Sequence, residues 1–247
     1  MVDKRMFLLI SVSILMGAVL LSGCLKPQII TDSLSLNVTA AATDASAFIE
    51  AGCLKNGDWG NRGLDCSSIG LEERFSCENI KIPDDLGGLS PNVPIVECTF
   101  ISKNWTGEED EGIVREGCLR PEFRKYIIIE DGEYRLIGSK EEFVRSFAPV
   151  ESPEEALGFA VALTTAYTDY DITIPNGART FTSEIRTTYV EEGDGGFNVH
   201  LFDAQSCGCG NHPYYSIDYI VTFAGEVNQT SSEKVYENPL FIGLCVD

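Results

Sequence analysis

The fold of the second half of the chain is decided by the stretch Ser152-Pro-Glu-Glu-Ala-Leu-Gly-Phe-Ala-Val-Ala-Leu163. Ser152 and Glu155 match a capping box, in which a serine oxygen and a glutamate three residues later satisfy free amides of a helix's first turn, and proline suits the first helical position. Apolar residues then recur at helical spacing, at Ala156, Phe159, Ala160, Leu163 and Tyr167. The pattern predicts an amphipathic helix over residues 153–168 with one buried face.

Four runs of alternating apolar residues follow this helix and predict strands, at 185–189, 197–201, 215–223 and 227–236. Alternation with one apolar face is typical of an antiparallel sheet, and the helix must cover that face. The side chains expected beneath the helix are Phe197, Val199, Leu201, Ile217, Tyr219 and Val221. We therefore expect an α+β fold over residues 126–247, with the helix packed on an antiparallel four-stranded meander, as in cystatin-like folds.

A hairpin and a short helix are predicted upstream. Asp131-Gly132 separates two β-rich runs, 125–130 and 133–138, which is a strong hairpin signal. Ser139-Lys-Glu-Glu142 matches another capping box and predicts a short helix that ends near Phe147. Residues 48–125 are rich in Cys and Gly, and they are expected to form a Cys-rich α+β region with a strand at 95–101.

The first 23 residues have the pattern of a secretory signal. Lys4 and Arg5 precede an uncharged apolar run, which ends at Leu21-Ser-Gly-Cys24. This tetrapeptide resembles the lipobox of prokaryotic lipoproteins, in which the Cys thiol is acylated. We expect a signal peptide over 1–23, lipidation of Cys24, and an anchor and linker over 24–47. The alternative is an uncleaved anchor helix with Cys24 incidental. Both place the remaining chain outside the cytoplasm, held to the membrane at its N-terminus.

The chain is strongly acidic, with a formal net charge of −20 over 247 residues. Such a charge argues against nucleic acid or an anionic lipid surface as the partner. Hydrophobic residues make up 44% of the chain, which is a globular composition rather than a disordered one.

Eight cysteines remain besides Cys24, and an even number in an exported chain favours disulfides. Five fall in the first half and three in the second: Cys53, Cys66, Cys77, Cys98, Cys118, Cys207, Cys209 and Cys245. If all eight pair, at least one bridge joins the two groups. The alternative is that two thiols stay free.

Several strings together resemble a group of uncharacterised prokaryotic secreted proteins and lipoproteins. They are Asp131-Gly-Glu-Tyr-Arg-Leu136, the segment 147–157, Cys209-Gly-Asn-His-Pro-Tyr-Tyr215 and the closing Gly243-Leu-Cys-Val-Asp247. The resemblance covers roughly residues 125–247. It supplies no catalytic residues, because the group has no assigned activity.

The resemblance implies that Cys209 pairs with Cys245. The expected hairpin of strands 215–223 and 227–236 agrees with this pairing, since it returns the chain to the loop that holds Cys209. Cys207 then pairs with the odd cysteine of the first half or stays free. The apolar tail after Pro239 is expected to cover another part of the molecule rather than face water.

Cys207, Cys209 and His212 form the most site-like cluster, because two thiolates and an imidazole could bind Cu(I) or Zn. Disulfides are the favoured interpretation, since exported thiols tend to be oxidised. Two acidic stretches, 108–111 and Asp169 with Asp171, lack the twelve-residue spacing of a calcium loop and are interpreted as solvated loops.

Nothing in the sequence matches a nucleophile elbow, a zinc-protease helix or a phosphate loop. The histidines are His200, expected on the polar face of its strand, and His212. We therefore expect a non-enzymatic extracytoplasmic lipoprotein without a cofactor, which binds an unknown protein or small ligand. The alternative is an extracytoplasmic metal-binding protein that uses Cys207, Cys209 and His212.

Overall fold

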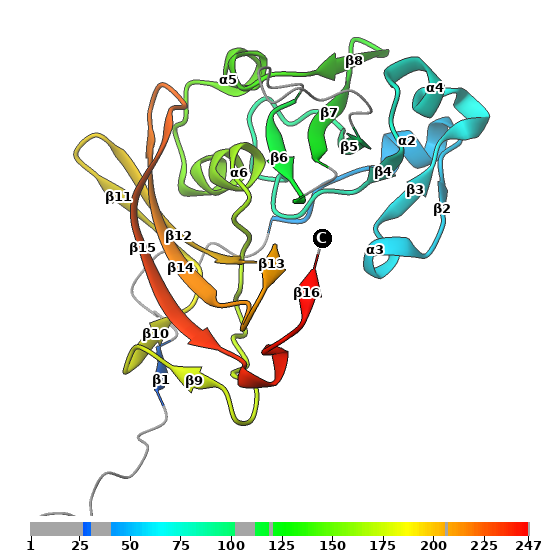
Figure 1. The fold of residues 1–247 in the computed structure, drawn as a ribbon. Coiled ribbons are helices and arrows are strands. Elements are labelled where there is room, and N and C mark those ends of the chain that lie inside the picture. Colours follow the sequence, from blue (N-terminus) through cyan, green and yellow to red (C-terminus); the bar gives the residue numbers. More distant parts are fainter. Residues whose placement is uncertain (1–26, 31–40, 102–111, 119–120, 206, 247) are drawn as a thin grey trace, which may run out of the picture.

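The computed structural model describes residues 27–30, 41–101, 112–118, 121–205 and 207–246 (Figure 1). The predicted signal peptide, Cys24 and the acidic stretch 108–111 lie outside these residues. Within them, no helix combines the length and the apolar character needed to cross a membrane.

The first sheet is antiparallel and is built mainly from the first half of the chain. Its strands run in the order β2 (Leu54–Lys55), β3 (Gly63–Asp65), β4 (Asn79–Lys81), β5 (Ile95–Ile101), β7 (Glu122–Glu130) and β6 (Val114–Glu116), and β8 (Glu133–Ile137) also pairs with β7. The strand predicted at 95–101 is confirmed as β5. The hairpin prediction is also confirmed, since Asp131 and Gly132 turn between β7 and β8 with φ values of 52° and 80°.

The second sheet is antiparallel and curls around one side of the molecule (Figure 1). It contains β11 (Tyr189–Gly193), β12 (Gly196–Ala204), β14 (Tyr214–Thr222), β15 (Val227–Glu237) and β9 (Arg179–Thr180), in that order. Two small pairings flank it: β1 (Gln28–Ile30) runs parallel to β10 (Glu184–Arg186), and β13 (Gly208–Cys209) pairs with β16 (Cys245–Val246). The strand predicted at 185–189 is therefore divided between β10 and β11, which lie in different sheets.

Apart from α6 (Pro153–Leu163), which has 11 residues and lies in the core, the described α-helices have eight residues or fewer. They are α2 (Ser46–Ala51), α3 (Asp58–Asn61), α4 (Leu71–Phe75) and α5 (Lys140–Phe147), with 3-10 turns η1 (Ser67–Ile69) and η2 (Pro239–Phe241). Ser152 and Glu155 form the predicted capping box at the start of α6. This helix ends at Leu163 instead of continuing to 168, because the chain turns extended at Thr164 and Tyr167 bridges to Phe202 of β12.

The core explains why α6 is not amphipathic. Every residue from Glu155 to Leu163 is buried. One side chain cluster joins α6 to Tyr126, Ile128 and Ile137 of the first sheet and to the six second-sheet residues expected beneath the helix. The helix is therefore covered from two sides rather than one.

The predicted fold class, a helix on a four-stranded antiparallel meander, is wrong. The protein is mostly β, with several antiparallel sheets that include a curled half-barrel. Alternation identified strands of the second sheet, but it could not show that β7 and β8 belong to a separate sheet on the other side of α6. The predicted boundary near residue 125 falls inside β7, and the predicted linker 24–47 contains β1, which is paired to β10.

Four disulfides fasten the sheets. Cys53–Cys66 and Cys77–Cys98 lie in the core of the first sheet, whereas Cys118–Cys207 joins a loop beside the first sheet to the loop after β12. Cys209 is bonded to Cys245, the pairing that the resemblance implied. These bonds are consistent with an extracytoplasmic location.

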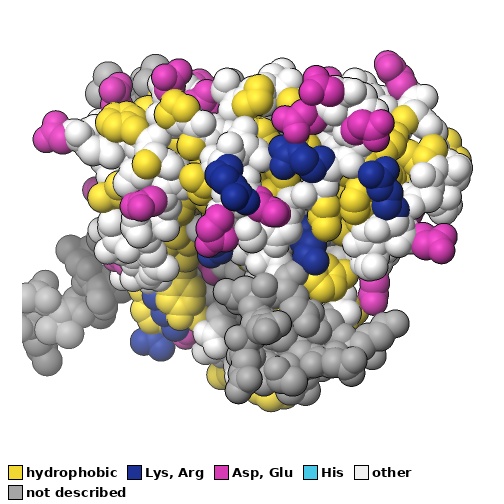
Figure 2. Space-filling model, turned by 90° about the horizontal axis from the view of Figure 1, so that it is seen from above, with side chains coloured by type: hydrophobic (Ala, Val, Ile, Leu, Met, Phe, Trp, Pro, Cys, Tyr) yellow, Lys and Arg dark blue, Asp and Glu magenta, His cyan; other side chains and the backbone are white. Residues whose placement is uncertain are grey.

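The apolar tail does not cover another part of the molecule, and that expectation is wrong. Leu240 and Ile242 are 82% and 70% exposed, and Phe241 and Leu244 are also exposed. The opposite end, seen from above in Figure 2, has acidic and basic side chains interspersed with apolar ones.

Candidate functional site

The loop that carries Cys207, Cys209 and His212 has a structural role, because disulfides and hydrogen bonds fasten it to other parts of the chain. Both sulfurs are in disulfides, so neither is a thiolate that could hold a metal. His212 lies with Nδ1 2.9 Å from the carbonyl oxygen of Gln205 and Nε2 3.1 Å from that of Leu244. The imidazole therefore fastens the C-terminal tail to this loop, and the three residues do not form a ligand set.

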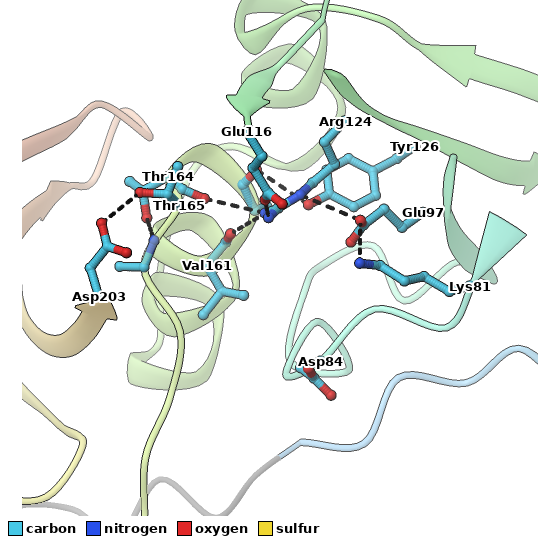
Figure 3. Close-up of polar contacts among 12 residues, drawn as sticks. Lys81, Asp84, Glu97, Glu116, Arg124, Tyr126, Val161, Thr164, Thr165 and Asp203 are labelled. Atoms are coloured by element: carbon cyan, nitrogen blue, oxygen red, sulfur yellow. Dashed lines mark hydrogen bonds and ion pairs between the residues drawn. The ribbon is translucent and has the colours of Figure 1, made fainter. Parts of the chain in front are cut away.

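A second polar cluster lies between the first sheet and the end of α6 (Figure 3). The Arg124 guanidinium donates from Nη1 to the carbonyl oxygens of Val161 and Thr164, at 3.1 and 3.2 Å, and its Nη2 pairs with Glu116. Glu97 lies 3.5 Å from Arg124 Nε and 2.9 Å from Lys81 Nζ. Arg124 thus caps the C-terminal carbonyls of α6 with a cation, where the helix dipole favours one.

The Arg124 cluster is closed in the sense that its charges are paired within it, although it borders a cavity of about 80 Å³, and Arg124 Nε and Glu97 Oε1, 3.5 Å apart, are buried without a hydrogen bond. The Tyr126 hydroxyl is buried and donates to the carbonyl oxygen of Ala162 at 3.2 Å, and burial raises the pKa of this phenol. Each charged group in the cluster faces an opposite charge or a carbonyl. We interpret the cluster as the joint that fixes the first sheet to α6, because its groups are engaged with one another.

The third polar cluster lies on the face of the second sheet that points away from α6. His200 of β12 is directly opposite Asp218 of β14 in the strand register, and its Nδ1 lies 2.6 Å from Asp218 Oδ1. Ser231 of β15 donates to the other Asp218 oxygen at 2.6 Å. These contacts, the histidine first, hold the pKa of the Asp218 carboxyl below its ordinary value.

Aromatic and cationic side chains hold the His200 ring in place. Tyr189, its register partner on β11, stacks on it with ring centroids 4.9 Å apart and planes 13° apart. Phe202 meets it edge-on at 5.3 Å, and Arg186 lies 4.0 Å above the Tyr189 ring. The packing leaves only 7% of His200 exposed.

The other imidazole nitrogen, Nε2, is buried and has no hydrogen-bond partner among the described residues. Buried polar groups are nearly always satisfied, so each exception needs an explanation. His200 also forms part of the wall of a cleft of about 300 Å³, which is at the small end of the range for ligand pockets.

Charges of both signs line this cleft. Arg186 and His200 lie on its wall with the carboxylates of Glu184 and Glu233, and hydroxyl groups come from Thr182, Ser216 and Ser231. The strands β10, β12, β14 and β15 supply most of these side chains, so the cleft depends on β10 covering the outer face of the second sheet. We call it the His200 cleft.

Ser231, Asp218 and His200 are in contact, but in an order that does not suit hydrolysis. A serine nucleophile must bond to the histidine that accepts its proton, and the carboxylate must bond to the far side of that histidine. Here the serine hydroxyl bonds to the carboxylate itself. The arrangement positions His200 and does not activate Ser231.

Asp169 and Asp171 are not brought together as a calcium site. Asp169 accepts hydrogen bonds from the Tyr214 hydroxyl at 2.6 Å and from the amide of Asp171 at 3.1 Å, so it organises its own loop. No group of three or more metal-ligating side chains occurs within the described part of the chain.

The His200 cleft has only a partial signal in the sequence. Alternation correctly placed His200 opposite Val199 and Leu201, but a polar face predicts solvent rather than a buried ring. The covering strand β10 was predicted as part of the sheet, and Asp218 and Ser231 stand in ordinary strand patterns. Only the strand register brings them to His200.

No protein-family model, curated protein or solved structure matches this chain. The resemblance to uncharacterised prokaryotic lipoproteins therefore stays a prediction, and the functional argument depends on the geometry of the His200 cleft.

Proposed function

We propose that this protein is a membrane-anchored extracytoplasmic binding module that holds a small zwitterionic ligand in the His200 cleft. The observation that carries this proposal is the buried His200 ring, oriented by Asp218 on one nitrogen and left without a partner among the described residues on the other. Because Nδ1 donates its proton to the Asp218 carboxylate, Nε2 of the neutral ring is an acceptor, and a ligand donor group, reached by a small shift of the surrounding side chains, supplies the missing hydrogen bond.

The charges of the cleft favour a zwitterion such as a free amino acid. Arg186 suits a carboxylate, whereas His200 Nε2 and the carboxylates of Glu184 and Glu233 suit an ammonium group. A non-enzymatic role is supported by the order of the Ser231–Asp218–His200 contacts, which leaves the serine without a base.

Native mass spectrometry of the full-length lipoprotein, purified from its own membranes, tests ligand binding. We expect a small-molecule adduct on the wild type that is lost from a His200→Phe variant, since phenylalanine keeps the stacking on Tyr189 but has no ring nitrogen. A Ser67→Ala variant, altered at an exposed turn far from the cleft in the sequence, serves as the control and should keep the adduct. Retention of the adduct by His200→Phe contradicts the proposal.

The anchor is tested separately, since it depends on the lipobox-like sequence. We expect the intact mass of the mature protein to correspond to a chain that begins at an acylated Cys24. The Cys24→Ala variant should lose that modification. An unmodified Cys24 in the wild type contradicts the lipoprotein prediction.

A further inference from the structure

We infer that the end of the molecule formed by β1, β9 and η2 rests on the bilayer. The inference depends on the proposed lipid anchor at Cys24, and it goes further because it assigns a particular face of the folded domain to the membrane. Figure 1 shows β1, β9 and the red turn between β15 and β16 together at the lower end of the molecule.

Exposed apolar side chains gather at this end, and we call them the lower-end patch: Ile29, Phe181, Leu240, Phe241 and Ile242. Pairing of β9 with the last residues of β15 places Phe181 and η2 at the same sheet end, and the amide of Gln28 in β1 donates to Ser183 at 2.8 Å. The tail carries no charged residue from Asn238 to Val246. An apolar surface of this kind marks an interaction site.

The position of the anchor selects the bilayer as the occupant. Because β1 is paired to β10, only Leu25 and Lys26 stand between Cys24 and Pro27, the first described residue, where a linker as far as residue 47 was expected. Three residues span at most about 10 Å when fully extended. A bilayer that holds the Cys24 lipid must therefore lie within about that distance of Pro27, which borders the same groove as Ile29 and Arg179.

The cations at this end also suit a lipid surface. Arg179 and Lys234 lie 5.1 and 4.2 Å from the centre of the Phe181 ring, and the Arg179 side chain is 70% exposed. An aromatic ring with cationic side chains beside it is typical of the headgroup region, where long basic side chains reach lipid phosphates. Both cations also pair with the single carboxylate of Glu237, so only one of their two positive charges is left to attract lipid phosphates, and the chain as a whole is acidic.

Quenching of a single tryptophan by brominated acyl chains tests the inference in the full-length lipoprotein. Both native tryptophans are replaced in Trp59→Phe and Trp105→Phe, and Phe241→Trp adds the probe. Phe223→Trp is the matched control, since Phe223 and Phe241 are 43% and 42% exposed and lie at opposite ends of β15. Ile242→Trp, at a more exposed position, keeps the test valid if Phe241→Trp fails to fold.

In neutral phosphatidylcholine vesicles with brominated chains, we expect the Phe241→Trp or Ile242→Trp protein to lose most of its fluorescence and the Phe223→Trp protein to lose almost none. Vesicle-bound protein with no quenching in any of these variants overturns the inference and leaves the anchor intact. Fluorescence of the Phe241→Trp protein that shifts to the blue without quenching shows a protein partner or a second copy on the patch, and this also overturns it. Protein that does not float with the vesicles contradicts the anchor, and the inference fails with it.

Discussion

The Arg124 cluster and the His200 cleft show two ways of burying polar groups on a sheet. Arg124 faces Glu97 and Glu116 and caps the carbonyls at the end of α6. His200 is held on one side by Asp218 and Tyr189, while Nε2 is buried beside a cleft without a partner among the described residues. Buried atoms without a hydrogen bond occur in both places, but those of the Arg124 cluster, Arg124 Nε and Glu97 Oε1, face an opposite charge, whereas His200 Nε2 does not. The fold alone explains the closed cluster, and the open site calls for a ligand.

The largest effect is expected when the closed cluster is broken. Arg124→Met leaves Glu116 without its cation and the buried Glu97 with Lys81 alone, and it removes the cap from α6. Removal of one partner of a buried pair costs about 3–5 kcal/mol, so the free energy of unfolding should fall by about that amount in denaturant titrations without reductant. The neighbour Lys125, which lies over the Phe100 ring at 4.0 Å, provides the control.

We expect Lys125→Met to change the free energy of unfolding by no more than about 1 kcal/mol, which is typical of a cation above an aromatic ring. Equal losses in Arg124→Met and Lys125→Met would show that the Arg124 cluster does not join α6 to the first sheet.

A smaller effect on stability is expected in the His200 cleft. His200→Phe keeps the ring stacking, and Asp218, whose side chain is 40% exposed, can bind water in place of the imidazole. We therefore expect the free energy of unfolding to change by no more than about 1 kcal/mol. A loss as large as that of Arg124→Met, measured in the same titration, would show that His200 has a structural role like that of the closed cluster.

The pH dependence of Asp218 separates the two sites further. Its pKa in the folded protein is lowered by the hydrogen bonds from His200 and Ser231. A lowered pKa gives stability that is present above the ordinary aspartate value and is lost as the pH falls through the folded value. Asp218→Asn should therefore reduce the melting temperature at neutral pH and flatten its decline in acid. An unchanged acid profile in this variant contradicts the contact with His200.

The smallest effect is expected at Asp85, a buried carboxyl outside both clusters. Burial raises its pKa, although Thr168 donates to it at 2.5 Å. The ionised form then costs stability as the pH rises through the folded pKa. Asp85→Asn removes this cost, and asparagine tolerates the local φ of 52°. We expect a rise in melting temperature of at most about 4 °C at neutral pH, and no rise in acid below the ordinary aspartate pKa. A fall at neutral pH contradicts this account.

The sequence predicted the parts of the fold that depend on local chemistry. The capping box of α6, the Asp131-Gly132 turn and the strand at 95–101 follow from neighbouring residues, and all three are present. The arrangement of the two sheets was not predictable. The helix α6 is covered on two sides, but its apolar residues are also compatible with a helix that buries only one face. The exposed tail was also missed, since apolar composition alone does not distinguish a core from an interaction surface.

The candidate site was less predictable than the fold. Two thiols and an imidazole drew attention to residues 207–212, but disulfides use both sulfurs. His200 became informative only through its register partners Tyr189 and Asp218, which come from separate strands. Such a contact has no signal in local spacing.

The most direct test of the account is nuclear magnetic resonance of the imidazole nitrogens of His200 while the twenty free amino acids are added in turn. We predict that at least one amino acid shifts the Nε2 signal at saturation, leaves the His212 signals unchanged, and has no binding site in the His200→Phe variant. An Nε2 signal that stays unchanged with all twenty, or an amino acid that binds the His200→Phe variant equally well, would contradict the claim that the His200 cleft holds a small zwitterion.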